Sequence, residues 1–283
     1  MAKTQREKAE AFRELHGGPR ILVLPNAWDA ISARVFEAAG FPAVGTTSAG
    51  VANVLGYTDG QFAPRDEVLF MVRRIAGTVQ IPVTADIEAG YGADSVEEVV
   101  KTVRGVLEAG AVGINLEDCA YGATELVDAG LQIEKIGAVR ALGESVGVPI
   151  VINARTDAFH LLDLSGPQQF GLAVERANAY RKAGADSLFV PFLTESATIG
   201  ELVKAIDGPL NILAMPGTPP ISALAVLGVA RVSVGSGPHR ATVALTRRIA
   251  EELRDHGTYD SIMTDTIPYP EVNALLEGCS RQA

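Results

Sequence analysis

Two carboxylates at the end of a short apolar run, Asp86 and Glu88, are the residues of this chain best suited to metal chemistry. The run that starts at Val83 is typical of a buried parallel strand, and glycines follow the carboxylates and let the chain turn. Side chains two residues apart on an extended backbone point the same way. The pair could therefore bind a divalent cation, or it could be a solvated acidic turn.

Eight such apolar runs must position these carboxylates and the other polar side chains. Each run is followed by a segment with helical periodicity, as in a strand–helix unit. The runs are Ile21–Pro25, Ala43–Thr47, Val83–Ile87, Val112–Glu117, Ile150–Ala154, Ser187–Pro191, Leu210–Ala214 and Arg231–Gly235. Eight units without a Pro- or Ser-rich linker predict an α/β chain with one domain over residues 1–283, a single (β/α)8 TIM-type barrel. A doubly wound dinucleotide-binding sheet is not expected, because the turn at 25–29 lacks the glycines it requires.

Both ends of the chain add to this barrel. Residues 1–18 are charged and amphipathic and predict an N-terminal helix that docks through Phe12 and Leu15. Residues 255–283 lie beyond the eighth unit and predict a C-terminal helical extension with a short helix around Val272–Leu276. This extension could dock on a neighbouring subunit, or it could pack on its own barrel.

The composition excludes several classes of function. Of the 283 residues 47% are hydrophobic and 20% are charged, and the net charge of −10 argues against binding to nucleic acid. Two cysteines, Cys119 and Cys279, provide no disulfide framework. The chain shows neither a signal-peptide core nor an apolar run of transmembrane length. We therefore expect a soluble cytoplasmic protein that does not bind a membrane.

Polar side chains follow most of the predicted strands at their carboxyl ends, where the active sites of such barrels lie. They are Thr46, Thr47, Ser48 and Asp59, then Asp86 and Glu88, Glu117 and Asp118, Arg155 and Asp157, Asn211, and Ser233 and Ser236. Because these strand ends meet at one rim, we expect the side chains to surround a common site.

Carboxylates at one rim repel one another unless a cation lies among them. The four in question are Asp59, Asp86, Glu88 and Glu117. Oxygen ligands without a His–Cys pairing favour a hard ion, Mg²⁺, with Mn²⁺ as the alternative. The guanidinium of Arg155 suits a carboxylate of a small di- or tricarboxylate or of a 2-oxo acid. Alternatively, Arg155 pairs with Glu117 or Asp157 and holds the rim together.

Five motifs occur in a set order along the chain: Leu-Pro-Asn-Ala-Trp-Asp-Ala at 24–30, Ala-Asp-Ile-Glu-Ala-Gly-Tyr-Gly at 85–92, Gly-Ile-Asn-Leu-Glu-Asp at 113–118, Asn-Ala-Arg-Thr-Asp-Ala at 153–158 and Ser-Val-Gly at 233–235. Together they resemble the isocitrate lyase/phosphoenolpyruvate mutase superfamily. The resemblance implies a (β/α)8 barrel with Mg²⁺ that acts on 2-oxo acids or their aldol-type adducts. It also implies a homo-oligomer, a tetramer whose subunits exchange C-terminal helices, which would give residues 255–283 a role.

The resemblance assigns roles around the metal. Asp86 would be the direct metal ligand, while Asp59, Glu88 and Glu117 would hold the water molecules of the metal. The metal would bind the 2-oxo and carboxylate oxygens and stabilise the enolate of pyruvate or of a similar product. Arg155 would bind the substrate, and with Glu117 and Asp59 it forms the set of catalytic candidates.

The resemblance also implies how the small-molecule carboxylate substrate is held. Backbone amides and hydroxyls of Thr46, Thr47 and Ser48 would surround a carboxylate group. Asn211, on the seventh predicted strand, is a further candidate for substrate binding.

The loop after the fourth strand departs from the superfamily pattern. Lyases of the superfamily carry Lys-Arg-Cys-Gly-His there, whereas residues 119–126 read Cys-Ala-Tyr-Gly-Ala-Thr-Glu-Leu. The Lys and Asn of phosphoenolpyruvate mutases and phosphonopyruvate hydrolases are missing as well. Pro191 stands where lyases place a glutamate, and Glu88 stands where many members have aspartate. These departures indicate a divergent short branch and argue against isocitrate lyase itself.

The proton donor is left open by these departures. Cys119 could act as an acid, although a buried small hydrophobe is the commoner role of a single cysteine. His160 and His239 follow strands and could supply a proton, with His239 the better placed. Tyr57 and Tyr91 could also donate, or they could pack the entrance.

We therefore expect an Mg²⁺-dependent carbon–carbon lyase or decarboxylase that acts on a small 2-oxo or 2-hydroxy polycarboxylate through a metal-stabilised enolate. One alternative is a phosphonopyruvate/phosphoenolpyruvate mutase or hydrolase. The other is a non-catalytic protein that binds 2-oxo acids after loss of its acid–base loop.

Overall fold

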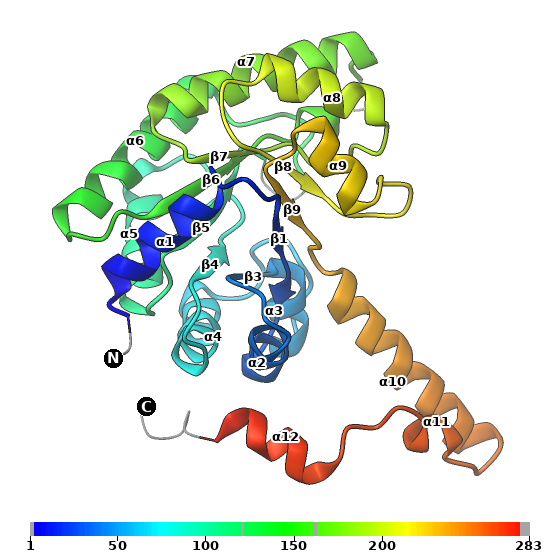
Figure 1. Cartoon of the computed structure of the whole chain (residues 1–283). Coiled ribbons are helices and arrows are strands. Elements are labelled where there is room, and N and C mark those ends of the chain that lie inside the picture. The colour runs from blue at the N-terminus through cyan, green and yellow to red at the C-terminus, as the bar shows by residue number, and fades with distance from the viewer. Residues whose placement is uncertain (1–2, 120–121, 161–162, 278–283) are drawn as a thin grey trace.

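Parallel strands form a nearly closed barrel surrounded by helices in the computed structural model, which describes residues 3–119, 122–160 and 163–277 (Figure 1). The strand order is β1-β9-β8-β7-β6-β5-β4-β3-β2, and all neighbours are parallel. The strands are β1 (Leu22–Leu24), β2 (Asn26–Ala27), β3 (Val44–Thr46), β4 (Val83–Asp86), β5 (Gly113–Glu117), β6 (Val151–Arg155), β7 (Ser187–Phe189), β8 (Leu210–Leu213) and β9 (Arg231–Ser233). The predicted (β/α)8 barrel is confirmed.

Pro25 explains why the first predicted strand appears as two. It separates β1 from β2 and has no backbone N–H to donate. The segment β1 pairs with β9, with Leu22 opposite Arg231, and β2 pairs with β3. One stretch of chain therefore joins both edges of the sheet and closes the barrel.

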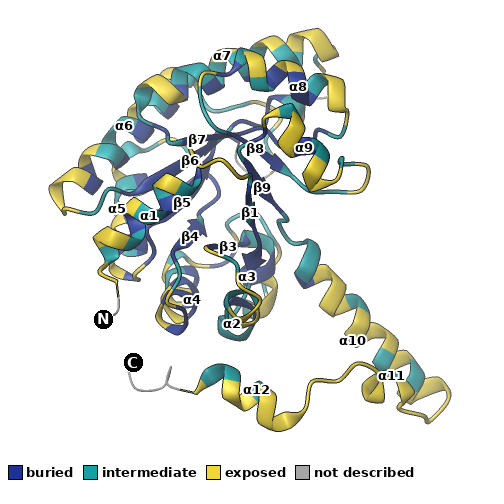
Figure 2. Ribbon diagram, in the orientation of Figure 1, coloured by how far each residue is buried: buried dark blue, intermediate teal, exposed yellow. Residues whose placement is uncertain are grey.

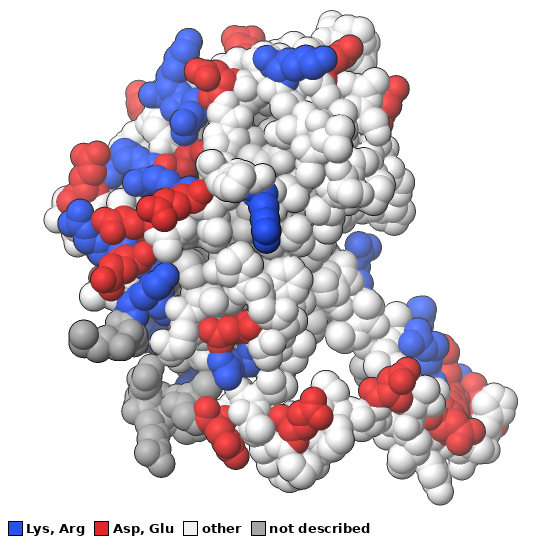
Figure 3. Space-filling model, in the orientation of Figure 1, with Lys and Arg blue, Asp and Glu red and all other residues white. Residues whose placement is uncertain are grey.

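The helices lie outside the strands. They are α1 (Gln5–Leu15), α2 (Ala30–Ala38), α3 (Ser48–Leu55), α4 (Arg65–Thr78), α5 (Val96–Glu108), α6 (Ala129–Ser145), the short 3₁₀ helix η1 (Ala158–His160), α7 (Gly166–Ala183), α8 (Ser196–Ala205), α9 (Ile221–Leu227), α10 (Gly237–Asp255), α11 (Asp260–Met263) and α12 (Tyr269–Leu276). None of these helices, in the part of the chain that is described, is long and apolar enough to cross a membrane. On the face shown in Figure 3, Lys and Arg are intermingled with Asp and Glu.

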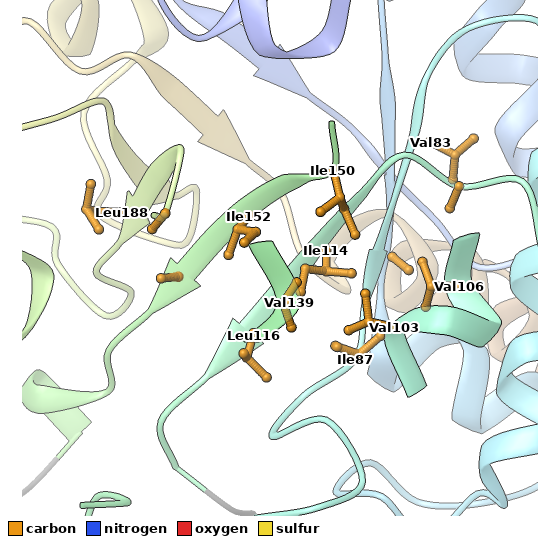
Figure 4. Packing of buried hydrophobic residues seen from close by; sticks show 14 of the residues in the cluster. Val83, Ile87, Val103, Val106, Ile114, Leu116, Val139, Ile150, Ile152 and Leu188 are labelled. Carbon is orange, nitrogen blue, oxygen red and sulfur yellow. The ribbon is translucent and has the colours of Figure 1, made fainter. Parts of the chain in front are cut away.

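Alternation along the strands separates the hydrophobic core from the interior of the barrel. On β5, Ile114 and Leu116 belong to the main core and pack between strands and helices, while Asn115 lines a cavity inside the barrel. Helix α5 covers this core with Val103 and Val106, and Figure 4 shows Val103 beside Ile87. The core thus lies in the layer between sheet and helices, which leaves the interior free for polar groups.

Helix α1 docks as predicted and covers the amino ends of the strands. Phe12 is fully buried in a cluster that includes Leu24, Val112 and Val151, and Leu15 packs at its edge. Next to this cluster, His16 is buried with its Nδ1 2.9 Å from the carbonyl oxygen of Phe12.

The C-terminal segment leaves the barrel. Helix α10 projects away from it, and the chain returns so that α12 lies near α2 (Figure 1). The predicted helix around Val272–Leu276 lies within α12, which contacts the chain's own barrel, since Arg34 Nε donates to the carbonyl oxygen of Leu275 at 2.6 Å. Most residues of α10, α11 and α12 are exposed, as Figure 2 shows in yellow, and Cys279 lies outside the described residues.

The burial of His16 predicts a pH-dependent loss of stability. Burial, and next the positive charge of Arg231, lower the pKa of His16 to about 4 from its usual 6.5, although Asp186 opposes the lowering and Arg13 adds to it. The folded protein keeps His16 neutral, whereas the unfolded chain binds a proton below about pH 6.5, so stability is lost as pH falls towards 4. His16 alone should lower the free energy of unfolding by about 2 kcal/mol between pH 7.5 and 5.

Urea unfolding of the wild type and of His16→Gln at both pH values measures this contribution. Between pH 7.5 and pH 5 the free energy of unfolding of the wild type should fall by about 2 kcal/mol more than that of His16→Gln. Equal pH dependence in both proteins would contradict the assignment.

Candidate active site

Two adjoining cavities, of about 240 Å³ and about 470 Å³, lie at the carboxyl ends of the strands and share Ser48, Asp59, Arg155 and Phe192 in their walls. All of the residues predicted to have a catalytic, substrate-binding or metal role line one or both of them, whereas Asp118, also expected at this rim, lines neither. Thr46, Thr47, Ser48, Asp59, Asp86, Arg155 and Asn211 line the smaller cavity, and Glu88 and Glu117 line the larger one. The structure thus brings the predicted residues together, while their roles stay predictions.

Asp86 is held in place at the end of β4 by polar contacts from two sides. Its Oδ2 accepts a hydrogen bond from Ser48 N (3.1 Å), at the first turn of α3, and its Oδ1 accepts one from Asn115 Nδ2 (3.0 Å). Its own N–H donates to Thr46 Oγ1 at 2.8 Å. The start of α3 carries partial positive charge, which stabilises the carboxylate. Asp86 is therefore fixed in position before any ligand binds.

Two further carboxylates lie close to Asp86. Burial, followed by the charges of Asp86 and Asp59, raises the pKa of Glu88 to about 8. Burial and the charge of Asp86 also raise the pKa of Asp59. The Oδ1 atom of Asp59 is buried without a hydrogen-bond partner. Three mutually repelling carboxylates, one with an unpartnered buried oxygen and none in an ion pair with a described Lys or Arg, form a site that suits a cation.

The backbone at Glu88 is unusual. Its φ of 53° is in the left-handed region, and its Oε1 accepts a hydrogen bond from Gln61 N at 3.1 Å. Gln61, with a φ of 63°, also accepts from Tyr91 N at 2.7 Å through its Oε1. Left-handed backbone is costly for residues with a side chain and persists where the surroundings fix it, often at functional sites. No role was predicted for Gln61, because nothing in its sequence context indicates this contact.

Arg155 pairs with carboxylates on both sides. Its Nη1 lies 2.7 Å from Glu117 Oε2, and its Nη2 lies 2.8 Å from Asp157 Oδ1. The guanidinium also lies over the rings of Phe189 and Phe192, at 5.7 and 5.8 Å from their centres. Burial raises the pKa of Glu117 well above its usual value, although Arg155 opposes the shift. The interpretation that Arg155 holds the rim together is confirmed, and its role towards a substrate stays a prediction.

Asp118 anchors this rim from behind. It is fully buried, and its Oδ1 accepts a hydrogen bond from Asp157 N at 3.0 Å. Its Oδ2 accepts from Tyr180 Oη at 2.7 Å and from Arg176 Nη1 at 3.1 Å. A buried network of this kind orders the ends of β5 and β6, which carry Glu117 and Arg155.

The predicted substrate-binding residues occupy two walls of the smaller cavity. Thr47 caps α3, and its Oγ1 accepts from Gly50 N at 3.5 Å, so α3 starts at the cavity. The other wall is formed by β8 and β9, where Asn211 Nδ2 donates to Ser233 Oγ at 3.3 Å.

Two asparagines inside the barrel, Asn115 and Asn153, were given no role from the sequence, unlike Asn211. Asn153 Nδ2 donates to Asn115 Oδ1 at 2.9 Å, and Asn115 in turn donates to Asp86. The two asparagines are opposite each other in the register of β5 and β6. Asparagine is depleted in strands, so its occurrence inside two predicted strands was the signal that could have revealed this chain of hydrogen bonds.

The candidate proton donors separate in the structure. Cys119 and His160 line the larger cavity, and burial raises the pKa of the Cys119 thiol to about 11. His239, expected to be better placed, instead packs its ring 5.4 Å from that of Trp28 and lines neither cavity. The reason is that β9 ends at Ser233 and His239 already belongs to the first turn of α10.

The two tyrosines contribute less to the site. Tyr57 Oη donates to Glu67 at 3.3 Å on the surface. Burial, and next the charge of Glu88, raise the pKa of Tyr91. Of the loop at 119–126 that departs from the lyase pattern, residues 120 and 121 lie outside the described residues.

Comparison with known proteins agrees with this geometry. The sequence model of the Phosphoenolpyruvate phosphomutase family matches residues 12–254. An oxaloacetate decarboxylase from Bradyrhizobium sp. (strain BTAi1) is 32% identical, with 89% of this chain and 85% of that protein covered. The 2-methylisocitrate lyase of Escherichia coli (strain K12) is 30% identical, with 90% of this chain and 87% of that protein covered.

Solved structures share the fold. A protein from Burkholderia cenocepacia J2315 superposes with a TM-score of 0.87 at 35% identity, covering 95% of this chain and 96% of that one. A 2,3-dimethylmalate lyase, a member of the PEP mutase/isocitrate lyase superfamily, superposes with a TM-score of 0.81 at 26% identity, covering 96% and 92%. The family model, the identities and the site geometry together show that the chain belongs to the phosphoenolpyruvate phosphomutase family, within the isocitrate lyase/phosphoenolpyruvate mutase superfamily.

Proposed function

We propose that this protein is an Mg²⁺-dependent carbon–carbon lyase or decarboxylase that acts on a small 2-oxo or 2-hydroxy polycarboxylate. The observation that supports the proposal is the convergence of Asp59, Asp86 and Glu88 on the two adjoining cavities, both of which Arg155 lines. Carboxylates next to an arginine suit a ligand that joins a cation to a carboxylate group. Relatives named 2-methylisocitrate lyase and oxaloacetate decarboxylase support this class of reaction.

The donor set fits a hard divalent cation held partly through water. Among the residues that the structure describes, no three His, Cys, Asp or Glu side chains are placed to hold a metal ion directly. Asp86 is therefore proposed as the direct ligand, with Asp59, Glu88 and Glu117 holding water molecules, as Mg²⁺ commonly requires. The unpartnered Oδ1 of Asp59 is an oxygen available for such a water. When bound, the cation would supply positive charge that stabilises negative charge developing on the 2-oxo oxygen.

The residues of the chain would orient the substrate and exclude water. Amides at the start of α3 and the hydroxyls of Thr47 and Ser48 would bind one carboxylate. Arg155, released in part from Glu117, would bind another oxygen of the substrate. Cys119 and His160, which share a cavity with Glu117, are the proposed proton donors.

Two other functions are tested by the same experiments. Mutase or hydrolase chemistry on phosphonopyruvate is the second candidate, favoured by the family whose model matches the chain. The missing Lys and Asn of the loop at 119–126 weigh against it. A non-catalytic binder of 2-oxo acids would be stabilised thermally by its ligand without forming product.

Replacing Asp86 by Ala should abolish turnover and weaken binding of Mg²⁺ or Mn²⁺ by more than about 100-fold, since loss of partners outside the first shell alone costs 10–100-fold. Titration calorimetry measures the metal affinity. The control is Asp207→Ala, an exposed aspartate that lines neither cavity, which should retain metal binding. Undiminished turnover of Asp86→Ala would refute the proposal.

A panel of substrates should separate the three candidate functions. The protein is incubated with Mg²⁺ and oxaloacetate, methylisocitrate, other 2-oxo and 2-hydroxy polycarboxylates, or phosphonopyruvate. We expect release of pyruvate, glyoxylate or carbon dioxide from a polycarboxylate. Turnover of phosphonopyruvate alone would favour the mutase or hydrolase, and thermal stabilisation without any product would favour the binding protein.

The C-terminal helices fit a homo-oligomer. Helix α10 buries only His239, and large apolar side chains along the segment are exposed, among them Leu253 at 48% and Met263 at 68%. Exposed apolar side chains concentrated on a segment that leaves the barrel favour an interface. We propose that a second copy of the chain covers it, with the helices exchanged between subunits of a tetramer.

Charges on this surface should therefore dissociate the assembly. Sedimentation velocity is expected to give a tetramer for the wild type and smaller species for the double variant Leu253→Asp and Met263→Asp. The matched control is Val226→Asp on α9, 88% exposed and outside the C-terminal helices, which should leave the tetramer intact. A monomeric wild type at micromolar concentration would disprove the exchange.

A further inference from the structure

Arg231 lies inside the barrel at the start of β9 and lines the smaller cavity. Only 3% of it is exposed to solvent. In the register of the sheet it is opposite Leu22 of β1 and Asn211 of β8. The same cavity reaches Asp86 and Arg155, so Arg231 shares one space with the proposed metal and substrate site.

This arginine differs from the partly buried arginines Arg140 and Arg176 because no carboxylate pairs with it among the described residues. Its Nη1 lies 3.3 Å from His16 Nε2, and its Nε is buried without any partner. By contrast, Arg140 pairs with Asp186 and Arg176 pairs with Asp118. A buried cation without a counter-charge is strongly unfavourable.

His16 cannot supply the missing charge. Its Nδ1 lies against the carbonyl of Phe12, which is an acceptor only, so Nδ1 carries the proton and Nε2 is left to accept from Arg231. A neutral imidazole satisfies one N–H group and leaves the charge of the guanidinium uncompensated. Accordingly, burial lowers the pKa of Arg231 to about 9, and Asp86 is the carboxylate whose charge opposes this.

The surrounding wall is polar, where barrels of this type usually hold Val, Ile and Leu. Asn211 and Ser233 line the cavity beside Arg231. Two further residues that line this cavity have buried oxygens without a hydrogen-bond partner, Thr84 Oγ1 and Asn153 Oδ1. Water could satisfy these hydrogen bonds, but water does not neutralise a buried positive charge.

We propose that the interior of the barrel holds a second anionic group of the substrate, a carboxylate bound by Arg231 beside Asn211. The inference rests on the proposed function, in which the start of α3 binds the first carboxylate of the same molecule and the cation held by Asp86 binds its 2-oxygen. Arg231 is then a specificity-determining residue that selects di- and tricarboxylates over monocarboxylates. It acts by binding and takes no part in bond cleavage.

The test compares two ligands that differ by one carboxylate, malate and lactate, each with wild type, Arg231→Met and Arg231→Lys. Affinities are measured by titration calorimetry with and without Mg²⁺. The wild type should bind malate at least about 30-fold more tightly than lactate, the effect of one buried charge pair. Arg231→Met should bring this ratio close to one without changing the affinity for lactate, and Arg231→Lys should restore part of it.

Thermal unfolding without ligand distinguishes this role from a structural one, because replacing an arginine that stabilises the fold would lower the melting temperature. Removing an unpaired buried charge should leave the melting temperature of Arg231→Met unchanged or higher. The matched control, Arg140→Met, removes one of the two arginines that pair with Asp186 and should melt at a lower temperature, while its malate-to-lactate ratio stays that of the wild type.

Three outcomes overturn the inference. If Arg231→Met keeps the preference for malate while Asp86→Ala has lost metal binding and turnover, the inference fails and the proposed function stands. If the wild type binds neither ligand, the substrate class of the proposed function fails with it. If phosphate or chloride stabilises the wild type and not Arg231→Met, while the malate-to-lactate ratio is unaltered, a free inorganic anion occupies the site and the substrate does not.

Discussion

Repulsion among buried carboxylates at one end of the barrel is the constraint to which the rest of the site is fitted. Asp86, Glu88 and Glu117 are brought there by strands that end at the same rim, and Asp59 by the loop between α3 and α4. Their burial disfavours the ionised forms, and each ionised neighbour adds to the cost, which is why the pKa values of three of them are raised. The remainder of the rim supplies compensation: the start of α3 for Asp86 and the guanidinium of Arg155 for Glu117.

The balance of charge at the rim depends on residues that lie behind the cavity walls. Asp118 does not reach the cavities, yet it holds Asp157, which in turn holds Arg155. On the other side, Gln61 fixes both Glu88 and the turn at Tyr91. The charges at the rim are therefore positioned by hydrogen bonds within the fold, and the substrate would meet a site already in place.

The strands and the site residues at their ends could be predicted from the sequence because they follow from periodicity. Alternation and apolar runs located all eight strands, and the carboxyl-end rule then placed Asp86, Glu117 and Arg155 on one rim without further information. Pro25 was visible too, although its consequence, a strand divided between two neighbours, depends on pairing across the closed sheet.

What could not be predicted depends on contacts between distant residues. The turn of α10 that carries His239 away from the cavity follows from where β9 ends, and strand ends are set by pairing. Arg231 was recognised only as the start of a strand, because its lack of a carboxylate partner is a property of everything around it. Gln61 gives no local signal at all.

Helix α1 has a consequence for the order in which this chain can fold. Its polar contacts reach Leu107, Asp186 and Arg231, residues 102, 173 and 215 positions away in the sequence. Strand β1 also needs β9 to form, because β9 is the strand with which it pairs. During synthesis residues 5–24 therefore cannot complete their native contacts until β9 has left the ribosome. Closing such long loops is slow, so this segment is among the last to be fully stabilised.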